Sequence, residues 1–317
     1  MKQQLRQAVG VLRNGWQRYR QWNRRRKERR RKPQNALEAA ISWVRSLLGA
    51  LVVVMIINGL AVASFVVPTG SMENTVMAGD FLFVNRLIFG PSTPQIIPFV
   101  NIPLPYIQFP GLRRPQRGDV IVFIFPGYRD EVRPREFQYY LKRCVAVAGD
   151  TLEIRNKRVF VNGVEQPLPP KALVTTLPPP PNDQYRTFPR GRGYTRDNYG
   201  PIRIPKRGDT IWLTLQNLLE WDIFIRREGH TVAVQQGQIL IDGQPRNFYV
   251  VERDYCFGLG DNRDNSEDSR YWGFIPMENV VGKPIIVYWS WDPNIPLWSI
   301  FAKLASVRLS RIGTLID

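Results

Sequence analysis

Histidine and cysteine are nearly absent from this chain. Its 317 residues include one histidine, His230, and two cysteines, Cys144 and Cys256. A Ser-His-Asp triad needs a histidine as its base, but His230 stands in "RREGHTV" with no motif around it, so we expect a surface or hydrogen-bonded structural histidine. These three residues are too few for an ordinary structural zinc site, and no metal or other cofactor is expected. Both cysteines lie in apolar, strand-like runs, which fit either a disulfide or two separately buried thiols.

Several common catalytic motifs are missing too. The sequence has no Gly-x-Ser-x-Gly elbow, Walker loop, dinucleotide fingerprint or metalloprotease histidine pair. The acid-rich loop at residues 258–276 does not follow the EF-hand pattern, because glycine and glutamate are absent from the positions where that pattern needs them. The sequence therefore does not indicate a hydrolase with a Gly-x-Ser-x-Gly elbow, a metalloprotease, a nucleotide-binding protein or an EF-hand protein.

Acidic residues are scarce at the N-terminus. Residues 1–32 hold 13 Lys and Arg and a single Glu, a net charge of +12, whereas the other 285 residues carry only +5. The excess positive charge is therefore a local arm rather than a basic domain. Such arms bind nucleic acid, coat anionic lipid or flank the cytoplasmic end of a membrane span.

The next segment favours the membrane. Leu47–Val66 is a run of 20 residues without a charge, and as a helix it would span about 30 Å, the thickness of a bilayer's hydrocarbon core. A buried core helix is one alternative. A cleaved signal peptide is another, since Ala61-Val62-Ala63 has the small-x-small form of a cleavage site, but the run is long for that purpose and more than 40 residues precede it. We expect a single retained anchor with the N-terminus in the cytoplasm, and no nucleic-acid partner.

The rest of the chain has the pattern of β-structure. Short runs rich in Val, Ile and Phe alternate with Gly, Asp, Asn and Pro, which predicts a mainly β fold, a membrane-anchored barrel or sandwich-like domain with an inserted β-rich lobe. A helix is expected at residues 210–227. The runs are "DFLFVNRLIF", "GDVIVFIF", "YYLKRCVAVAG", "DTLEIRNKRVFVNG", "HTVAVQQGQILIDG" and "NVVGKPIIVYWSW".

Composition divides the chain into six parts. Residues 150–167 resemble residues 230–247, either as a duplicated hairpin or as ordinary strand-turn-strand sequence. The last part either lies on the membrane surface or packs on the core. The parts are a basic cytoplasmic arm at 1–46, a transmembrane anchor at 47–66, the first part of a catalytic β domain at 67–166, a Pro-rich insertion with a repeated hairpin-like unit at 167–250, the completion of the β domain at 251–295 and an amphipathic C-terminal segment at 296–317.

A serine just past the anchor is the candidate nucleophile. Ser71 stands in "PTGSM", and without a histidine the alternative base is a lysine made neutral by burial. The pKa of lysine in water is about 10.4, so such a residue must lie in apolar surroundings. Lys142 in "QYYLKRCVAVAG" meets that condition, although most strand lysines point to solvent.

The motifs together resemble a known family. "PTGSM", "GD" with "FVNR", "RGDVIVF", "YLKRCVAVAGD" and "GDNRDNSEDSRYWGFIP" follow an apolar anchor in the order found in bacterial type I signal peptidase, the leader peptidase of the export pathway. The resemblance covers most of residues 45–125, 138–165 and 250–290. It implies a membrane-bound serine endopeptidase that removes signal peptides from exported precursors after a small-x-small motif. It also implies single-pass insertion in the bacterial inner membrane, with the catalytic domain on the periplasmic face.

The resemblance also assigns roles to residues. Ser71 is the nucleophile and Lys142 its general base, Ser266 orients the lysine amine, and Thr69 joins the Ser71 N–H in the oxyanion hole. Many family members have proline three residues after the nucleophile, where this chain has Asn74, so the turn there is expected to differ. Four residues are expected to hold the shape of the loop: Asp261, Arg263, Asp268 and Arg270.

Substrate recognition is predicted from the same segment. An extended peptide would add a strand to the edge beside "VVPTG", and shallow pockets lined by Val66, Met72 and Leu141 would admit small side chains. Ordinary core packing is the alternative for these three residues. Two other functions remain open: a self-cleaving repressor that uses a Ser-Lys pair but has no membrane span, and a non-enzymatic membrane scaffold.

Overall fold

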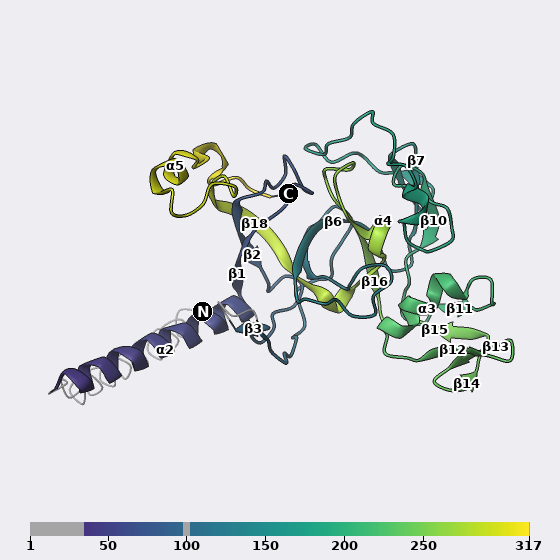
Figure 1. The fold of residues 1–317 in the computed structure, drawn as a ribbon, viewed down its shortest axis with the longest axis horizontal. Coiled ribbons are helices and arrows are strands. Elements are labelled where there is room, and N and C mark those ends of the chain that lie inside the picture. The colour runs from purple at the N-terminus through teal and green to yellow at the C-terminus, as the bar shows by residue number, and fades with distance from the viewer. Residues whose placement is uncertain (1–34, 98–101, 317) are drawn as a thin grey trace, which may run out of the picture. The chain divides into compact units, whose positions relative to one another are not determined.

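The structure, a computed structural model, describes residues 35–97 and 102–316 (Figure 1). The basic stretch at residues 1–32 therefore lies outside the described residues. Internal contacts divide the chain into two units, Met1–Val54 and Met55–Asp317, and each is described by itself.

An apolar helix, α2 (Ala36–Leu60), has 25 residues and is long and apolar enough to cross a membrane. The anchor was expected at residues 47–66, but this helix begins earlier and ends at Leu60, and Val62–Val66 form strand β1. Hydrogen bonding explains the end of the helix. The carbonyl of Ala61 accepts from the N–H of Arg86, which begins the antiparallel pairing of β1 with the next strand.

The main sheet has seven strands that pair antiparallel in the order β1-β2-β18-β5-β6-β16-β17 and curl into a half-barrel (Figure 1). The expected mainly β fold is confirmed. Strand β1 stands at one end of this order, and its Ala63 is buried opposite Val84. The strands are β1 (Val62–Val66), β2 (Asp80–Asn85), β5 (Val120–Ile124), β6 (Tyr139–Val147), β16 (Tyr255–Leu259), β17 (Ile275–Pro276) and β18 (Val280–Ser290).

The centre of this sheet is buried on both faces. In β5, Val120 and Val122 pack into one apolar cluster, while Ile121 and Phe123 pack into another. All five residues of the strand are buried, which is why its sequence "VIVFI" is a continuous apolar run instead of an alternating one. Strand β6 pairs with this strand, which is buried on both faces. Polar side chains in the middle of β6 therefore lie in an environment from which water is largely excluded.

A second β-rich lobe lies between β6 and β16 in the chain. It begins at β7, before residue 167, where the proline content placed the insertion. Its apolar core is continuous with the main sheet, because Val145 of β6 and Phe257 of β16 belong to the same cluster. Its strands are β7 (Thr151–Arg155), β8 (Arg158–Val161), β9 (Val164–Glu165), β10 (Tyr199–Arg203), β11 (Thr210–Trp212), β12 (Val232–Gln235), β13 (Gln238–Ile241), β14 (Gln244–Pro245) and β15 (Phe248–Val250).

The two similar sequence segments fold alike. Strands β7-β8-β9 and β12-β13-β14 are both antiparallel meanders. Each second turn is a two-residue turn with positive φ at both positions, Asn162-Gly163 in one and Asp242-Gly243 in the other. Asn-Gly and Asp-Gly are the pairs that favour this hairpin turn, so the sequence similarity has a direct structural meaning.

The helix expected at 210–227 is shorter than predicted. Residues Thr210–Trp212 pair with β15, and α3 (Leu218–Arg227) begins only after a turn held by Asn217. The Asn217 side chain donates to the Trp212 carbonyl and accepts from the Thr214 N–H, which fixes the turn. The remaining elements are β3 (Ile96–Ile97), β4 (Ile102–Pro103), α4 (Ser269–Trp272), α5 (Ile300–Ala305) and the 3₁₀ turns η1 (Asp183–Tyr185), η2 (Met277–Asn279) and η3 (Leu309–Arg311).

Candidate active site

Ser71 lies in the turn between β1 and β2. The turn is tight, because the Glu73 N–H donates to the Gly70 carbonyl and the Val76 N–H to the Met72 carbonyl. A second loop holds it from outside: the backbone N–H of Asn262 donates to the Ser71 carbonyl at 3.0 Å. The side chain of Ser71 is thereby left to face the sheet.

Lys142, on β6, meets that serine. Its Nζ lies 2.6 Å from the Ser71 Oγ, and this is the hydrogen bond that the lysine makes within the described residues. The lysine is only 4% exposed. Gly258 on the neighbouring strand leaves room for it, since a Cβ there would lie 3.0 Å from the Lys142 Cβ.

The surroundings of the amine favour its neutral form. Burial lowers the pKa of Lys142 to about 8, against the opposing influence of nearby carboxylates, of which Asp268 is the strongest. Among the described residues, no carboxylate forms an ion pair with the Lys142 amine. At pH 7 roughly a tenth of this lysine is therefore unprotonated, far more than for a lysine in water, and that fraction can accept the Ser71 proton.

The loop after β16 is pinned by one buried ion pair to β6. Both nitrogens of the Arg143 fork bind Asp261, at 2.8 and 2.7 Å, and Asp261 also accepts from the Thr75 hydroxyl at 2.6 Å. Asp261 is fully buried. The contact joins β6, the turn after Ser71 and the loop, so it fixes three parts of the site together.

A second buried pair closes the same loop. Arg270 binds both oxygens of Asp268 at 2.8 Å, and Asp268 accepts from the Gly260 N–H at 3.0 Å. Arg270 also donates to the Arg263 carbonyl. Burial acts to raise the pKa of Asp268, but the charge and hydrogen bonds of Arg270 outweigh it and keep that pKa below its usual value.

Three further residues were expected to contribute to the site: Ser266, Arg263 and Thr69. The Ser266 Oγ is buried and makes no hydrogen bond within the described residues, so the expected bond to Lys142 is not present. It lies close to the turn nonetheless, because a Cβ at Gly260 would collide with both Ser266 and the Ser71 carbonyl. Arg263 contributes to the loop through its backbone, not through its side chain. Thr69 is exposed beside the serine.

The residue expected to set this turn apart, Asn74, has an unusual backbone conformation. Asn74 has φ of 69°, in the left-handed region. Proline holds φ near −65° and cannot adopt this conformation, whereas asparagine tolerates it better than most residues. The substitution and the turn geometry therefore agree with each other.

A cavity of about 600 Å³ opens onto the dyad. Val66, Met72 and Leu141, the three residues expected to line a substrate pocket, all border it. They differ in burial: Val66 is 55% exposed, whereas Met72 is 1% exposed and belongs to the core. The cavity lies between β1 and the first residues of β6, Tyr139–Lys142, and both Thr69 and Ser71 reach it.

The other sparse residues lie apart from this site. His230 hydrogen-bonds to Asp242 at 2.6 Å and to Glu252 at 2.9 Å in the second lobe, as a structural histidine would. Cys144 and Cys256 are both buried with free thiols on adjacent strands. Within residues 35–97 and 102–316, no group of three or more His, Cys, Asp or Glu side chains is placed to hold a metal ion.

Sequence reasoning missed some residues that shape the site. Arg143 follows Lys142 directly, and its partnership with Asp261 was not foreseen. Asn262, which holds the Ser71 carbonyl, and Glu267, which borders the cavity, gave no sequence signal beyond membership of the acid-rich loop.

The chain is similar to a known protein family over most of its length. A family model described as signal peptidase, peptidase S26, matches residues 40–289. The chain is 28% identical over 263 residues to Signal peptidase I of Helicobacter pylori, covering 80% of this chain and 84% of that protein. It is 30% identical over 277 residues to Signal peptidase I of Rickettsia typhi, covering 82% and 88%.

A third relative, Signal peptidase I of Aquifex aeolicus, is 27% identical over 292 residues and is covered over 95% of its length. A crystal structure of a signal peptidase I from Enterococcus faecalis is 21% identical, with a TM-score of 0.24, and covers 55% of this chain and 98% of its own. The family model spans most of the chain, including both the serine turn and the loop after β16. This chain belongs to the signal peptidase family, peptidase S26.

Proposed function

We propose that the protein is a membrane-bound serine endopeptidase that removes N-terminal signal peptides from exported precursors by a Ser71–Lys142 dyad. The observation that carries the proposal is the 2.6 Å contact between the Lys142 Nζ and the Ser71 Oγ inside an apolar site. The family contributes the reaction class, and the contact contributes the pair of atoms that can perform it. No metal or cofactor is needed for this chemistry.

The reaction begins with the transfer of one proton. Neutral Lys142 takes the hydroxyl proton as the Ser71 Oγ attacks the scissile carbonyl, which gives a tetrahedral oxyanion and a lysine ammonium. The ammonium then returns its proton to the leaving amine, and an acyl-enzyme ester remains on Ser71. Lys142, neutral again, deprotonates a water molecule that hydrolyses the ester and restores the serine.

The oxyanion needs hydrogen-bond donors that are already in place. The backbone N–H of Ser71 donates to no other described group, and the exposed Thr69 hydroxyl is likewise without a partner in the part of the chain that the structure describes. Donors of this kind are worth about 2.7–4 kcal/mol each in other enzymes. Ser266, whose Oγ is unpaired, is proposed to orient the Lys142 amine when the site is occupied.

Substrate binding uses the cavity between two strand segments. We propose that the residues before the cleavage site bind in extended form along β1, which stands at the end of the sheet, and opposite Tyr139–Leu141 of β6. Backbone hydrogen bonds then supply affinity without demanding particular side chains. Val66 and Leu141 narrow the space beside the serine, and the buried Met72 closes it from below, which favours a small-x-small motif.

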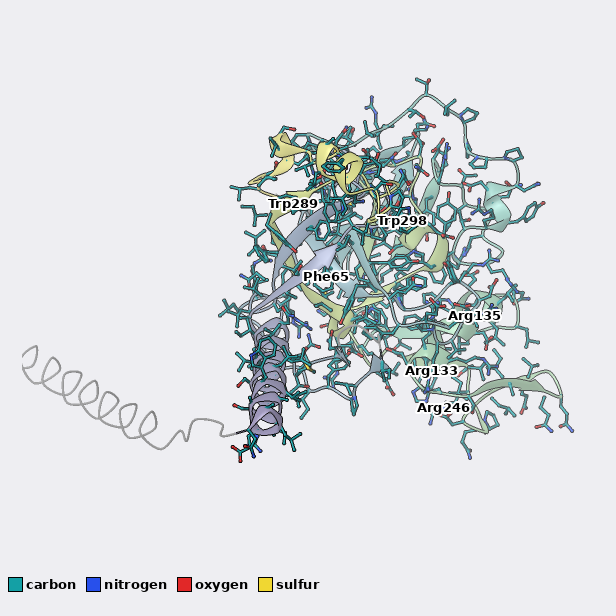
Figure 2. The ribbon with its side chains drawn as sticks, turned by 60° about the vertical axis from the view of Figure 1, so that its left-hand side comes forward. Phe65, Arg133, Arg135, Arg246, Trp289 and Trp298 are labelled. Carbon is teal, nitrogen blue, oxygen red and sulfur yellow. The ribbon has the colours of Figure 1, made fainter. Side chains whose placement is uncertain are left out.

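Membrane lipid is the second proposed partner. Helix α2 is a candidate span, and the basic residues before it favour a cytoplasmic N-terminus and a catalytic unit outside the bacterial inner membrane. Within the catalytic unit, the C-terminal segment exposes Trp298 and Phe301 by 84% and 90%. Figure 2 shows Trp298 and Trp289 on one side of this unit and the exposed Arg133 and Arg246 on the other. A lipid surface would cover such an aromatic face.

The function is tested with the detergent-solubilised full chain and a precursor that carries a small-x-small site. We expect one cut, after that motif, identified by sequencing the new N-terminus of the product. Ser71→Ala is expected to abolish the cut, while Ser64→Ala, an exposed serine on β1, is expected to preserve it. Undiminished cleavage by Ser71→Ala would exclude the proposed nucleophile. A self-cut after Ala63 is checked in the same samples, and the burial of Ala63 in β1 argues against it.

A further inference from the structure

A second cavity, of about 640 Å³, lies behind the loop that holds Ser71. Its walls come from the loop after β16, from β6 and from the hairpin of β7 and β8. Part of the lining is apolar, with Val145, Val159 and Leu168. The charged part is mostly basic: Arg117, Arg143, Lys157, Arg158 and Arg263, with Glu165 as the acidic lining residue.

Four of these five cations have carboxylate partners in the protein. Each of these four positive charges is compensated by a carboxylate of the protein, so none of the four needs a ligand. The pairs are Arg117 with Asp150, Arg143 with Asp261 at 2.7 Å, Lys157 with Asp264 at 3.0 Å and Arg158 with Glu165 at 3.6 Å.

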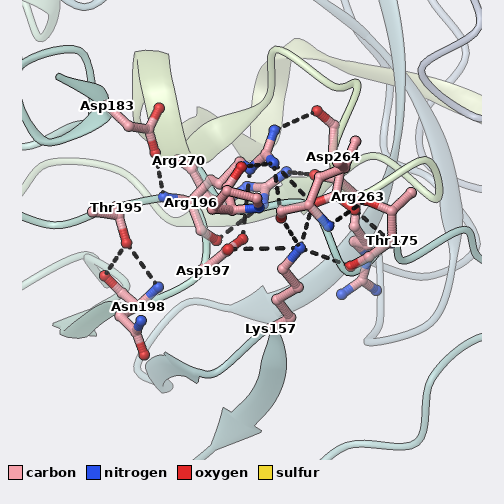
Figure 3. A network of polar contacts seen from close by, with 12 residues as sticks. Lys157, Thr175, Asp183, Thr195, Arg196, Asp197, Asn198, Arg263, Asp264 and Arg270 are labelled. Carbon is pink, nitrogen blue, oxygen red and sulfur yellow. Dashed lines mark hydrogen bonds and ion pairs between the residues drawn. The ribbon is translucent and has the colours of Figure 1, made fainter. Parts of the chain in front are cut away.

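Arg263 is the exception. It is 5% exposed, and within the described residues its guanidinium makes neither a hydrogen bond nor an ion pair. Its Nε is fully enclosed and unpaired, so the rest of the fork is what remains to meet a ligand in the cavity. Figure 3 shows Arg263 beside the network in which Lys157 and Arg196 both pair with Asp264.

The carboxylates nearest to Arg263 are already engaged. Asp261 is held by Arg143 and Asp268 by Arg270, in both cases through two bonds. Burial lowers the pKa of Arg263 to about 10, which still leaves it charged at neutral pH. A buried charge without a partner costs several kcal/mol. The structure therefore contains a charged fork whose partner is not part of this chain's described residues.

We propose that this cavity is an anion site in which Arg263 binds a phosphate group. The planar fork of arginine matches phosphate oxygens in pairs. The apolar wall of the cavity, with Val145, Val159 and Leu168, suits the organic part of a phosphate ester. The phosphate is either free or carried on a lipid headgroup, and the two sources share this chemistry.

The site also has a route to the catalytic turn. Arg263 follows Asn262, whose N–H holds the Ser71 carbonyl, and the Arg263 N–H donates to Leu173 on the far side of the loop. An anion on Arg263 would stabilise this loop in the position that supports the nucleophile. The proposal does not depend on the dyad, because binding is measured without substrate.

The test is a phosphate titration of the full chain in uncharged detergent and phosphate-free buffer. We expect inorganic phosphate to raise the thermal midpoint saturably, by about 3–5 °C at ten times the dissociation constant, above sodium chloride of equal ionic strength. Arg263→Gln is expected to lose the whole shift. Arg158→Gln, which removes an exposed and paired cation of the same cavity, is expected to keep it.

Two further arms make the result decisive. If Arg263→Gln does not fold, Arg263→Lys keeps the charge without the fork, and its phosphate affinity is expected to fall about tenfold. Micelles containing phosphatidylglycerol replace free phosphate in a parallel titration, and a shift seen only there identifies a lipid headgroup as the source. The proposal is overturned if neither form of phosphate shifts the midpoint, or if the shift survives in Arg263→Gln.

Discussion

The two cavities of the catalytic unit each hold one buried cation without a carboxylate partner, and they treat it differently. Lys142 is 4% exposed and Arg263 is 5% exposed, yet only lysine can escape the cost of burial by losing its proton. In the first cavity, the role that we propose for the neutral amine is that of a base. In the second cavity, Arg263 keeps its charge, and we propose that a bound anion compensates it. Arg143 and Arg270, which are buried just as deeply, instead have aspartate partners and serve as fixed supports.

The largest effect is expected where the unpaired lysine is removed. Lys142→Met should lower the rate of precursor cleavage by at least about 10³-fold, because the general base is lost. The same change should stabilise the fold at pH 7. The folded-state pKa of about 8 lies below the unfolded value, so burial of the ammonium opposes folding at pH 7 and that penalty disappears with the amine, a gain of about 2–3 kcal/mol.

Cleavage assays and thermal midpoints of the same samples check both halves of this prediction. Lys142→Arg is the matched control, since it keeps a charge that cannot be lost. It should be inactive and should gain no stability. If the Lys142→Met protein were less stable than the parent, burial of the Lys142 ammonium would not oppose folding, and this prediction would be wrong.

The paired arginines should behave in the opposite way. Asp268→Asn leaves Arg270 buried without its partner, and we expect a loss of about 3–5 kcal/mol in the free energy of unfolding, measured by denaturation in detergent. Glu278→Gln breaks an exposed pair with Arg253 and is the control, with an expected change within about 1 kcal/mol. If both variants lowered the free energy of unfolding by the same amount, the proposed difference between buried and exposed ion pairs would be wrong.

The pH dependence of cleavage should follow Lys142. Below about pH 8, kcat/KM is expected to fall about tenfold for each unit of acidification, because the protonated amine cannot accept the Ser71 proton, and above that pH it should level off. Glu267, near the amine, raises the pKa of Lys142, so Glu267→Gln should move the midpoint to lower pH. A profile centred near pH 6.5, or one unchanged in Glu267→Gln, would point to another base.

The sequence predicted much of the fold and the Ser71–Lys142 pair, but not every boundary or contact. Local patterns located the strands, and "VIVFI" and "YYLKRCVAV" indicated a dry sheet in which a lysine could be neutral. The order of motifs then paired Ser71 with Lys142. The end of the helix at Leu60 was missed, because the apolar residues of β1 extend the hydrophobic run without a break.

Long-range pairing was the part that sequence could not supply. Asp261 has two arginines near it in the motif, Arg263 and Arg270, but binds Arg143, which is 118 residues away in the chain. Composition cannot distinguish a paired arginine from an unpaired one, so Arg263 was grouped with Arg270 among the residues expected to hold the shape of the loop. Only the register of β6 against β16 shows which guanidinium meets which carboxylate.

The smallest effect is expected for a cation that has partners but lies near the surface. His230 bonds to Asp242 and Glu252, and the hydrogen bond that its ring donates to Asp242 raises the pKa of His230. A raised pKa adds stability below the unfolded value of about 6.5, and that stability is lost as the pH rises through the folded-state pKa. His230→Gln should therefore lower the free energy of unfolding slightly at pH 5.5, by no more than about 1 kcal/mol, and leave it unchanged at pH 9, as measured by denaturation in detergent. A difference of the same size at both pH values would mean that the ring acts by packing against Tyr249 rather than by its charge.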